Sequence, residues 1–164
     1  MTMDDLEYQL DLSVRYHDKR RGFFERINRV ITILTALTSL GAVGILLTKA
    51  SPQMQAWLTA AVAFFALTEL VVQTGHRAHA HMDLRCRYID MQRTIISAAN
   101  PNLKELIGQK LLIDADEPAK LRILALIVHN EVVRKRNSGD KHLVKLSFFQ
   151  RLVAPWFDLF PSKV

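Results

Sequence analysis

Hydroxyl groups recur at helical spacing inside one apolar stretch of the chain. The hydroxyl residues and one small residue are spaced at intervals of three and four, so they share one face of a helix: Thr32, Thr35, Ser39 and Ala42. In an oligomer, such a face can line a narrow, uncharged path for ions. The same residues also suit close packing of the helix against a neighbour, and the sequence leaves both roles open.

A single carboxylate, Glu69, lies inside a second apolar stretch. Ionisable groups in such a position tend to face a bundle interior or water. A ring of Glu69 side chains in an oligomer would favour cations at the mouth of a pore. Alternatively, Glu69 reaches the membrane interface and pairs with Arg29, and both interpretations remain open.

Small side chains form further strips at helical spacing. Gly41 and Gly44 lie beside the hydroxyl face, and Ala56, Ala60 and Ala63 form a smooth strip in the second stretch. Small residues let helix backbones approach closely. These strips therefore predict helix contacts, either within the chain or with a second copy.

The two apolar stretches, Val30–Leu47 and Met54–Val72, are long enough to cross a bilayer. The chain is 49% hydrophobic and 23% charged, yet almost all of its charges lie outside these stretches. A soluble bundle with two buried central helices is the alternative, but the rest of the chain is too small to cover both. We expect spans at about 30–47 and 54–73, joined at Pro52 into an antiparallel hairpin, 30–74.

Basic residues at the outer ends of the two stretches predict the orientation. Several arginines precede the first stretch and follow the second, whereas the connection holds only Lys49. Lysine and arginine stay on the cytoplasmic side of a membrane. Both termini are therefore expected in the cytoplasm.

The remaining segments look helical throughout. Residues 1–29 form an amphipathic helix whose apolar stripe includes Leu6, Leu10 and Val14, and which runs unbroken into the first span. Residues 75–140 hold cytosolic helices, the first continuing from the second span as far as Asn100–Pro101. The sequence DADEP is expected to cap the next helix, with Pro118 in its first turn.

Residues 141–164 form an amphipathic tail rich in aromatic residues, with NSGDK before it as a loop. Its composition suits the lipid headgroup region, although packing against the rest of the chain is an equal alternative. No strand-like alternation occurs. The fold class is therefore all-α: a two-helix transmembrane hairpin whose long helices extend into a cytosolic helical bundle.

Other chemistry-bearing residues argue against an enzyme. His76 and His79 share a helix face but His81 points elsewhere, so no metal-ligand set is apparent. A basic segment facing lipid headgroups is the commoner explanation of the three histidines, and proton sensing is an alternative. The triplet His129-Asn130-Glu131 faces three directions on a helix, which favours structural hydrogen bonding. The glycines are scattered and form no phosphate-binding loop. We expect no catalysis, metal or cofactor, and the single cysteine, Cys86, allows no intrachain disulfide.

The formal net charge of +6 is concentrated beside the apolar stretches. The side chains expected to contact lipid headgroups or a ligand are Arg20, Arg21, Arg26, Arg29, His76, Arg77, Arg85 and Arg87. Anionic lipid is the favoured partner of this basic belt. A nucleotide or oligonucleotide regulator is the alternative.

The order of these elements resembles the SLATT family, the SMODS- and SLOG-associating two-transmembrane effector domains of bacteria. The likeness rests on YHDKRRGFFERINRV before the first stretch, ELVVQTGHRAHAHMDLRCRYIDMQ after the second, LALIVHNEVVRKRN, and FFQRLVAPWF near the end. It implies an inner-membrane homo-oligomer that forms a pore in anti-phage defence and arrests or kills the cell. Control would come from a separate sensor or synthase protein that uses a nucleotide signal.

A membrane-anchored adaptor without conduction is the alternative function. The two functions differ in a measurable way, because only a pore makes ion flux depend on Thr35 and Ser39. An adaptor would instead depend on its cytosolic helices.

Overall fold

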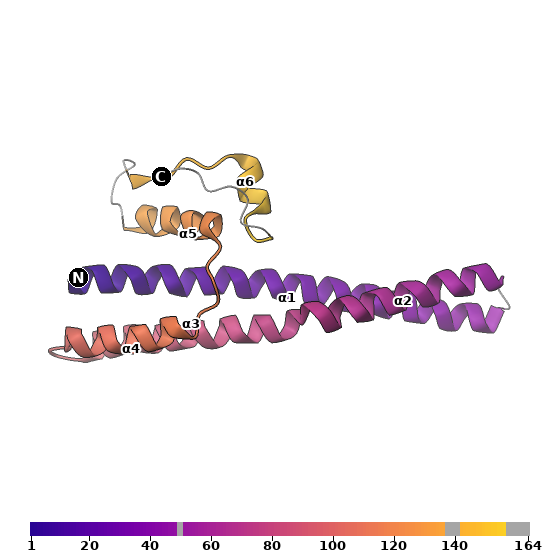
Figure 1. Cartoon of the computed structure of the whole chain (residues 1–164), viewed down its shortest axis with the longest axis horizontal. Coiled ribbons are helices and arrows are strands. Elements are labelled where there is room, and N and C mark those ends of the chain that lie inside the picture. Colours follow the sequence, from indigo (N-terminus) through magenta and orange to yellow (C-terminus); the bar gives the residue numbers. More distant parts are fainter. Residues whose placement is uncertain (49–50, 137–141, 157–164) are drawn as a thin grey trace. The chain divides into compact units, whose positions relative to one another are not determined.

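The computed structural model describes residues 1–48, 51–136 and 142–156, without the side chains of residues 42 and 45–48. Its helices are α1 (Met3–Thr48), α2 (Pro52–Val72), α3 (Thr74–Ser97), α4 (Leu103–Ala115), α5 (Arg122–Lys135) and α6 (Phe148–Val153) (Figure 1). The described residues contain no strand, which confirms the all-α prediction. The expected NSGDK loop, 137–141, and the end of the tail, 157–164, lie outside the described residues.

The chain divides into two compact units. The helical unit comprises Met1–Arg20 and Ala80–Val164, and the apolar unit comprises Arg21–His79. Each unit therefore contains part of α1 and part of α3.

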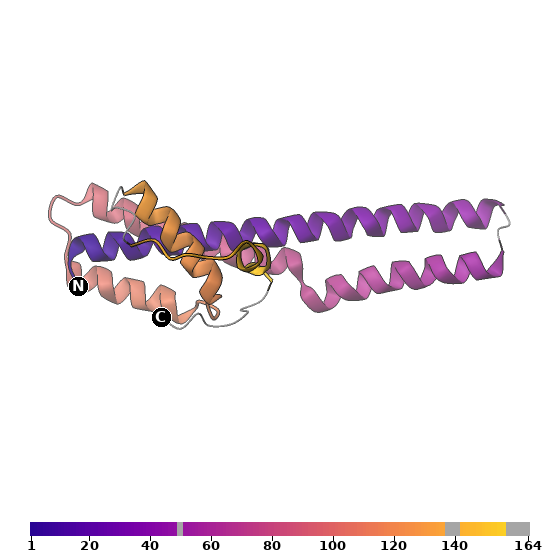
Figure 2. The same ribbon diagram turned by 90° about the horizontal axis from the view of Figure 1, so that it is seen from above.

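The first part of α1 lies between two apolar clusters of the helical unit (Figures 1 and 2). On one side, Leu6 and Leu10 pack with residues of α3 and α4, including Tyr88 and Leu106. On the other side, Tyr16 packs with residues of α5 and with Ala154, which follows α6. Burial of these side chains supplies the main free energy that holds the four surrounding helices on α1.

The buried face of α1 includes more than the expected stripe. Leu6 and Leu10 are buried, and the partly buried Val14 packs against the same cluster, which agrees with the prediction. Ser13 and His17 are also buried, at 2% and 0% exposed. Hydrophobicity alone did not indicate these two polar positions.

The apolar unit is built around α2. Ser51 caps this helix by accepting a hydrogen bond from the amide of Met54, and Pro52 follows in its first turn. Gly41 of α1 faces Leu58 of α2, because a Cβ atom added at Gly41 would lie 3.6 Å from the Leu58 side chain. The residues of α2 nevertheless include none that is buried.

One break interrupts the helix that was expected to run on to Asn100–Pro101. Gln73 has a left-handed backbone with φ of 50°, and its amide donates to the carbonyl of Glu69 at 2.8 Å. This conformation ends α2 and redirects the chain into α3, which itself ends at Ser97. Because left-handed geometry is unusual for a residue other than glycine, the sequence carried no sign of it.

The expected cap before α5 is also absent. Asp116 closes α4 at its C-terminal end, and α5 begins only at Arg122, with Leu121 at its N-cap and no side-chain cap hydrogen bond. Pro118 thus belongs to the segment between the helices. That segment places Glu117 against α1, as described below.

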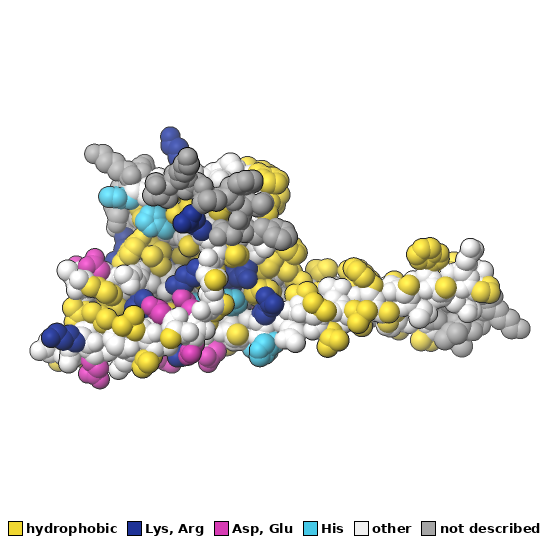
Figure 3. Space-filling view, viewed as in Figure 1, with side chains coloured by type: hydrophobic (Ala, Val, Ile, Leu, Met, Phe, Trp, Pro, Cys, Tyr) yellow, Lys and Arg dark blue, Asp and Glu magenta, His cyan; other side chains and the backbone are white. Residues whose placement is uncertain are grey.

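One helical stretch in the described part of the chain, Pro52–Ser97, is long and apolar enough to cross a membrane, and its most apolar window has no buried residue. The first expected span, 30–47, includes side chains outside the described residues, so two spans remain a prediction. In Figure 3, the region around α2 shows hydrophobic side chains and hardly any charged ones.

Candidate functional site

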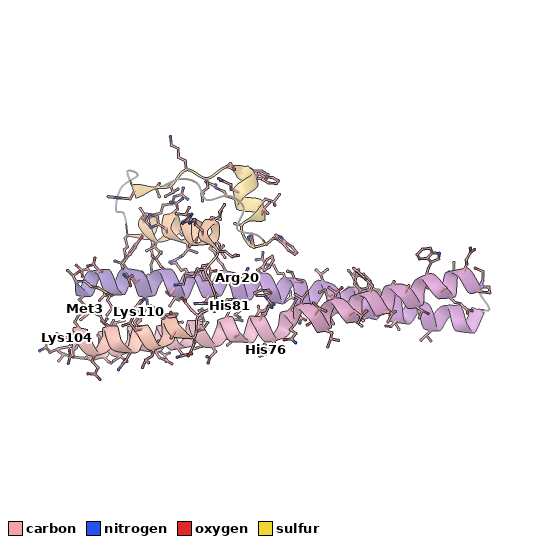
Figure 4. The ribbon with its side chains drawn as sticks, viewed as in Figure 1. Met3, Arg20, His76, His81, Lys104 and Lys110 are labelled. Carbon is pink, nitrogen blue, oxygen red and sulfur yellow. The ribbon has the colours of Figure 1, made fainter. Side chains whose placement is uncertain are left out.

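Two buried histidines meet in the helical unit. His17 of α1 is 0% exposed and His81 of α3 is 5% exposed, and their Nδ1 atoms lie 2.9 Å apart. Figure 4 shows His81 on the side of α3 that faces α1, whereas His76 points away from the helices. A contact between two ring nitrogens at this distance holds one proton, because one nitrogen must donate and the other must accept.

Glu117 determines which way the chain of hydrogen bonds runs. Nε2 of His17 donates to Oε1 of Glu117 at 2.5 Å, and Nζ of Lys120 lies 2.8 Å from Oε2. Burial raises the pKa of Glu117, but the hydrogen bonds and charges of His17 and Lys120 outweigh it and lower the pKa below its ordinary value. Glu117 is therefore an ionised acceptor, and the Nε2 atom of His17 carries a proton.

Tyr88 forms one wall of this polar centre. Its ring stacks on His17 with 5.7 Å between centroids and 14° between planes. Its hydroxyl donates to Oδ1 of Asp114 at 2.7 Å, and Lys110 pairs with the other oxygen of Asp114 at 2.6 Å. Burial, with the neighbouring carboxylates Asp114 and Glu117, raises the pKa of Tyr88, so its phenol stays protonated as a donor.

This arrangement can hold a proton and pass it along a line of groups. The line runs from Glu117 through His17 to His81 and joins three segments: α1, α3 and the connection between α4 and α5. No group of three or more potential ligands among the described residues could hold a metal ion. The hydrogen bonds of His17, His81 and Glu117 support proton binding.

Glu69 binds a hydroxyl group rather than Arg29, its partner in one of the two interpretations. Its Oε2 accepts a hydrogen bond from Thr74 Oγ1 at 2.6 Å, and the same hydroxyl lies 3.0 Å from Oδ1 of Asn28. No ion pair between described residues joins Glu69 to Arg29. The carboxylate is thus held beside the left-handed residue Gln73, where α2 meets α3.

The expected pore-lining residues differ in exposure within a single chain. Thr32 is exposed, Thr35 and Ser39 are half-buried, and the side chain of Ala42 lies outside the described residues. Gly41 contacts Leu58, whereas a Cβ atom at Gly44 would meet nothing within 4 Å. Ala56, Ala60 and Ala63 are exposed in the single chain.

Several members of the basic belt have partners within the chain. Arg21 binds Glu25 at 2.6 Å, and Arg87 binds Asp116 at 2.7 Å. Further members are engaged as follows: Arg20 donates to the carbonyl of Pro155, Arg77 lies over the ring of Phe24, and Arg85 Nε lies 3.1 Å from Asp18 without hydrogen-bond geometry. Arg26, Arg29 and His76 are exposed. The carboxylate partners of Arg21, Arg85 and Arg87 offset part of the positive charge of the belt.

All three side chains of the triplet in α5 make contacts within the helical unit. His129 lies 2.6 Å from the hydroxyl of Tyr8, and Glu131 pairs with Lys19 at 2.8 Å. The Asn130 amide binds both the carbonyl and the amide of Val144, at 2.7 and 2.8 Å. These contacts hold the segment after α5 and the first part of α1 against α5.

The described part of the tail has one packed side and one exposed side. Ala154 is 1% exposed and packs into the second cluster, but the aromatic residues stand out: Phe148, Phe149 and Trp156 are 82%, 65% and 57% exposed. Ser147 and Gln150 form a capping box that fixes the start of α6. The prediction of a headgroup-facing tail therefore stays open to a direct test.

We expect Trp156 to insert into lipid, because exposed aromatic rings beside Arg151 suit the interface. The chain has two tryptophans, so Trp57→Phe leaves Trp156 as the only one. Vesicles with lipids brominated near the headgroup should quench its fluorescence by about half or more. Two results together would show that the tail avoids lipid. The fluorescence of Trp57→Phe would stay unchanged in these vesicles, and the fluorescence of Trp156→Phe would still be quenched through Trp57.

Sequence reasoning missed most of the polar centre. It considered His81 with His76 and His79, as a metal ligand, a proton sensor or part of a basic segment facing lipid, and did not single out His17, Tyr88 or Glu117. A signal was present for the first two: spacing of three or four residues links Leu10, Ser13 and His17, and also His81, Leu84 and Tyr88. No signal pointed to Glu117, because it lies in a connection 100 residues from His17.

Comparison with family models, curated proteins and solved structures finds no match to this chain.

Proposed function

We propose that this chain is a multi-pass protein of the bacterial inner membrane, with α2 and the last part of α1 crossing the bilayer as a hairpin and both termini in the cytoplasm. The observation that carries the proposal is the bare surface of α2. Trp57, Phe64 and Leu70 are 76%, 64% and 68% exposed, and no residue of α2 is buried. Soluble monomers rarely expose an apolar surface that runs along a whole helix.

We further propose that copies of the chain assemble in the membrane into a pore or ion channel. The exposed strip of Ala56, Ala60 and Ala63 offers a surface on which a second copy can pack closely. The hydroxyl face containing Thr35 and Ser39 then supplies a weakly polar path. In keeping with the SLATT resemblance, the pore would act as an effector in nucleotide-signalled anti-phage defence, stopping growth or killing the cell.

Membrane potential measured with a voltage-sensitive dye during expression in a bacterium tests this function. We expect the wild type to depolarise the inner membrane, and Ser39→Leu to reduce the effect at matched expression by blocking the path. Glu69→Gln should also change the depolarisation, because it removes the charge that lies next to Thr74, where α2 meets α3. The matched controls are Thr59→Leu, on α2 outside the hydroxyl face, and Glu105→Gln, an exposed carboxylate in α4.

Equal depolarisation by all variants would contradict the proposed lining, and a steady potential with the wild type would contradict conduction by the chain alone. The second candidate function, a membrane-anchored adaptor, is favoured by apolar residues on the helical unit. Ile96, Leu111 and Leu112 are 85%, 62% and 70% exposed. An adaptor would lose function with Leu111→Ser and Leu112→Ser and would show no ion flux.

A further inference from the structure

We propose that His17, His81 and Glu117 form a proton-sensitive latch, which holds the connection between α4 and α5 on α1 and α3 at neutral pH and releases it on acidification. This inference concerns the helical unit alone and stands whether or not the apolar unit conducts ions. It starts from the 2.9 Å contact between two Nδ1 atoms and the 2.5 Å contact between His17 and Glu117.

The geometry limits how many protons the pair can hold. Because Nε2 of His17 donates to Glu117, a neutral His17 must accept at Nδ1, and His81 must donate from its Nδ1. If His17 is the imidazolium, the direction reverses and His81 accepts. In both states, one proton lies between the two rings. A second would place two N–H groups against each other, so the contact must break.

The charged groups described around the pair already have partners. Among the described residues, the ionisable groups next to the pair include Tyr16 and Asp18 from α1, Arg85 and Tyr88 from α3, Asp114 from α4, and Glu117 and Lys120 from the connection. Asp18 pairs with Arg85, and Asp114 serves Lys110 and Tyr88. The single negative charge of Glu117 is already shared with Lys120, so it can offset at most the positive charge of His17.

Because His17 and His81 are buried, losing the contact between their rings must move other groups as well. His17 and His81 are almost inaccessible to water, so repulsion between two imidazolium groups there is poorly screened. The pair relieves it by moving apart, and His17 is the group that holds Glu117. Histidine is the side chain whose charge changes closest to physiological pH, so acidification is the condition that supplies the second proton.

Hydrogen exchange measured by mass spectrometry on the full chain in lipid nanodiscs tests the latch. After correction for the intrinsic pH effect, we expect exchange of the 114–121 amides to rise roughly tenfold between pH 7.5 and 5.5. His81→Gln keeps a hydrogen-bonding side chain but cannot gain charge, so it should abolish most of the rise. His79→Gln is the matched control, because His79 is an exposed histidine on the same helix.

A wild-type rise that persists in His81→Gln would overturn the proposal, as would no rise in the wild type. If His81→Gln fails to fold, ring-nitrogen NMR of the wild type decides the question. We expect one Nδ1 of the pair to be protonated and the other bare at pH 7.5, and uptake of the second proton to coincide with faster exchange. Full protonation of both rings with unchanged exchange would exclude a latch.

Discussion

Two lysines placed in the middle of α2, Phe64→Lys with Leu67→Lys, are expected to remove the chain from the membrane. Each lysine at the centre of a span costs about 3 kcal/mol relative to an apolar residue, so the pair costs about 6 kcal/mol. On the surface of a soluble protein, the same changes would cost about 0.5 kcal/mol or less each. The two environments therefore predict clearly different outcomes.

The measurement is the share of the protein that remains in the membrane pellet after an alkaline carbonate wash. We expect most of the wild type and little of the double variant in the pellet. Leu111→Lys with Leu112→Lys is the matched control, because these leucines of α4 are 62% and 70% exposed, against 64% and 59% for Phe64 and Leu67. Equal retention of the two double variants would show that α2 is not immersed in lipid.

The contrast between α2 and α4 also shows what the sequence could predict. Leu111 and Leu112 are as exposed as the residues of α2, but only the α2 residues belong to a long run without charge. Run length separates a span from a scattered surface leucine. Helical character and the positions of the apolar stretches could therefore be read from residue order alone.

The candidate site could be predicted only in part, because it depends on contacts between distant segments. Helical spacing places His17 after Ser13 on a stripe, and a reader who admits polar residues to a stripe could find it. The partners of His17 are 64 and 100 residues away, and the periodicity of one helix says nothing about them. Gln73 escaped prediction because its side chain gives no sign of left-handed geometry.

Tyr88→Ala is expected to destabilise the helical unit by about 4 kcal/mol, the usual loss when a buried aromatic ring leaves a cavity. Tyr88 is 0% exposed, packs in the first cluster and stacks on His17. The change would remove a large share of the 5–15 kcal/mol that typically stabilises a domain. Leu112→Ala is the control and should cost about 0.5 kcal/mol or less, because Leu112 is 70% exposed.

Tyr88→Phe separates the hydroxyl from the ring. It keeps the packing but removes the hydrogen bond to Asp114, so we expect a loss of about 1 kcal/mol at neutral pH, measured by thermal unfolding of the full chain in detergent. A loss as large as that of Tyr88→Ala would show that the hydrogen bond matters more than the packing of the ring.

The pH dependence of stability, compared between the wild type and Tyr88→Phe, gives an independent check on the Tyr88 hydroxyl. Burial raises the pKa of Tyr88 above 10.0, its ordinary value, and the carboxylates Asp114 and Glu117 add to the shift. The folded state therefore binds the phenol proton more tightly than the unfolded chain does. The resulting stabilisation is fully present below pH 10.0 and declines as the pH rises beyond it.

Because Tyr88→Phe has no such proton, the advantage of the wild type over this variant should shrink above pH 10 and stay constant between pH 7 and 9. An advantage that persists unchanged to pH 11 would mean that the Tyr88 hydroxyl is not buried against Asp114.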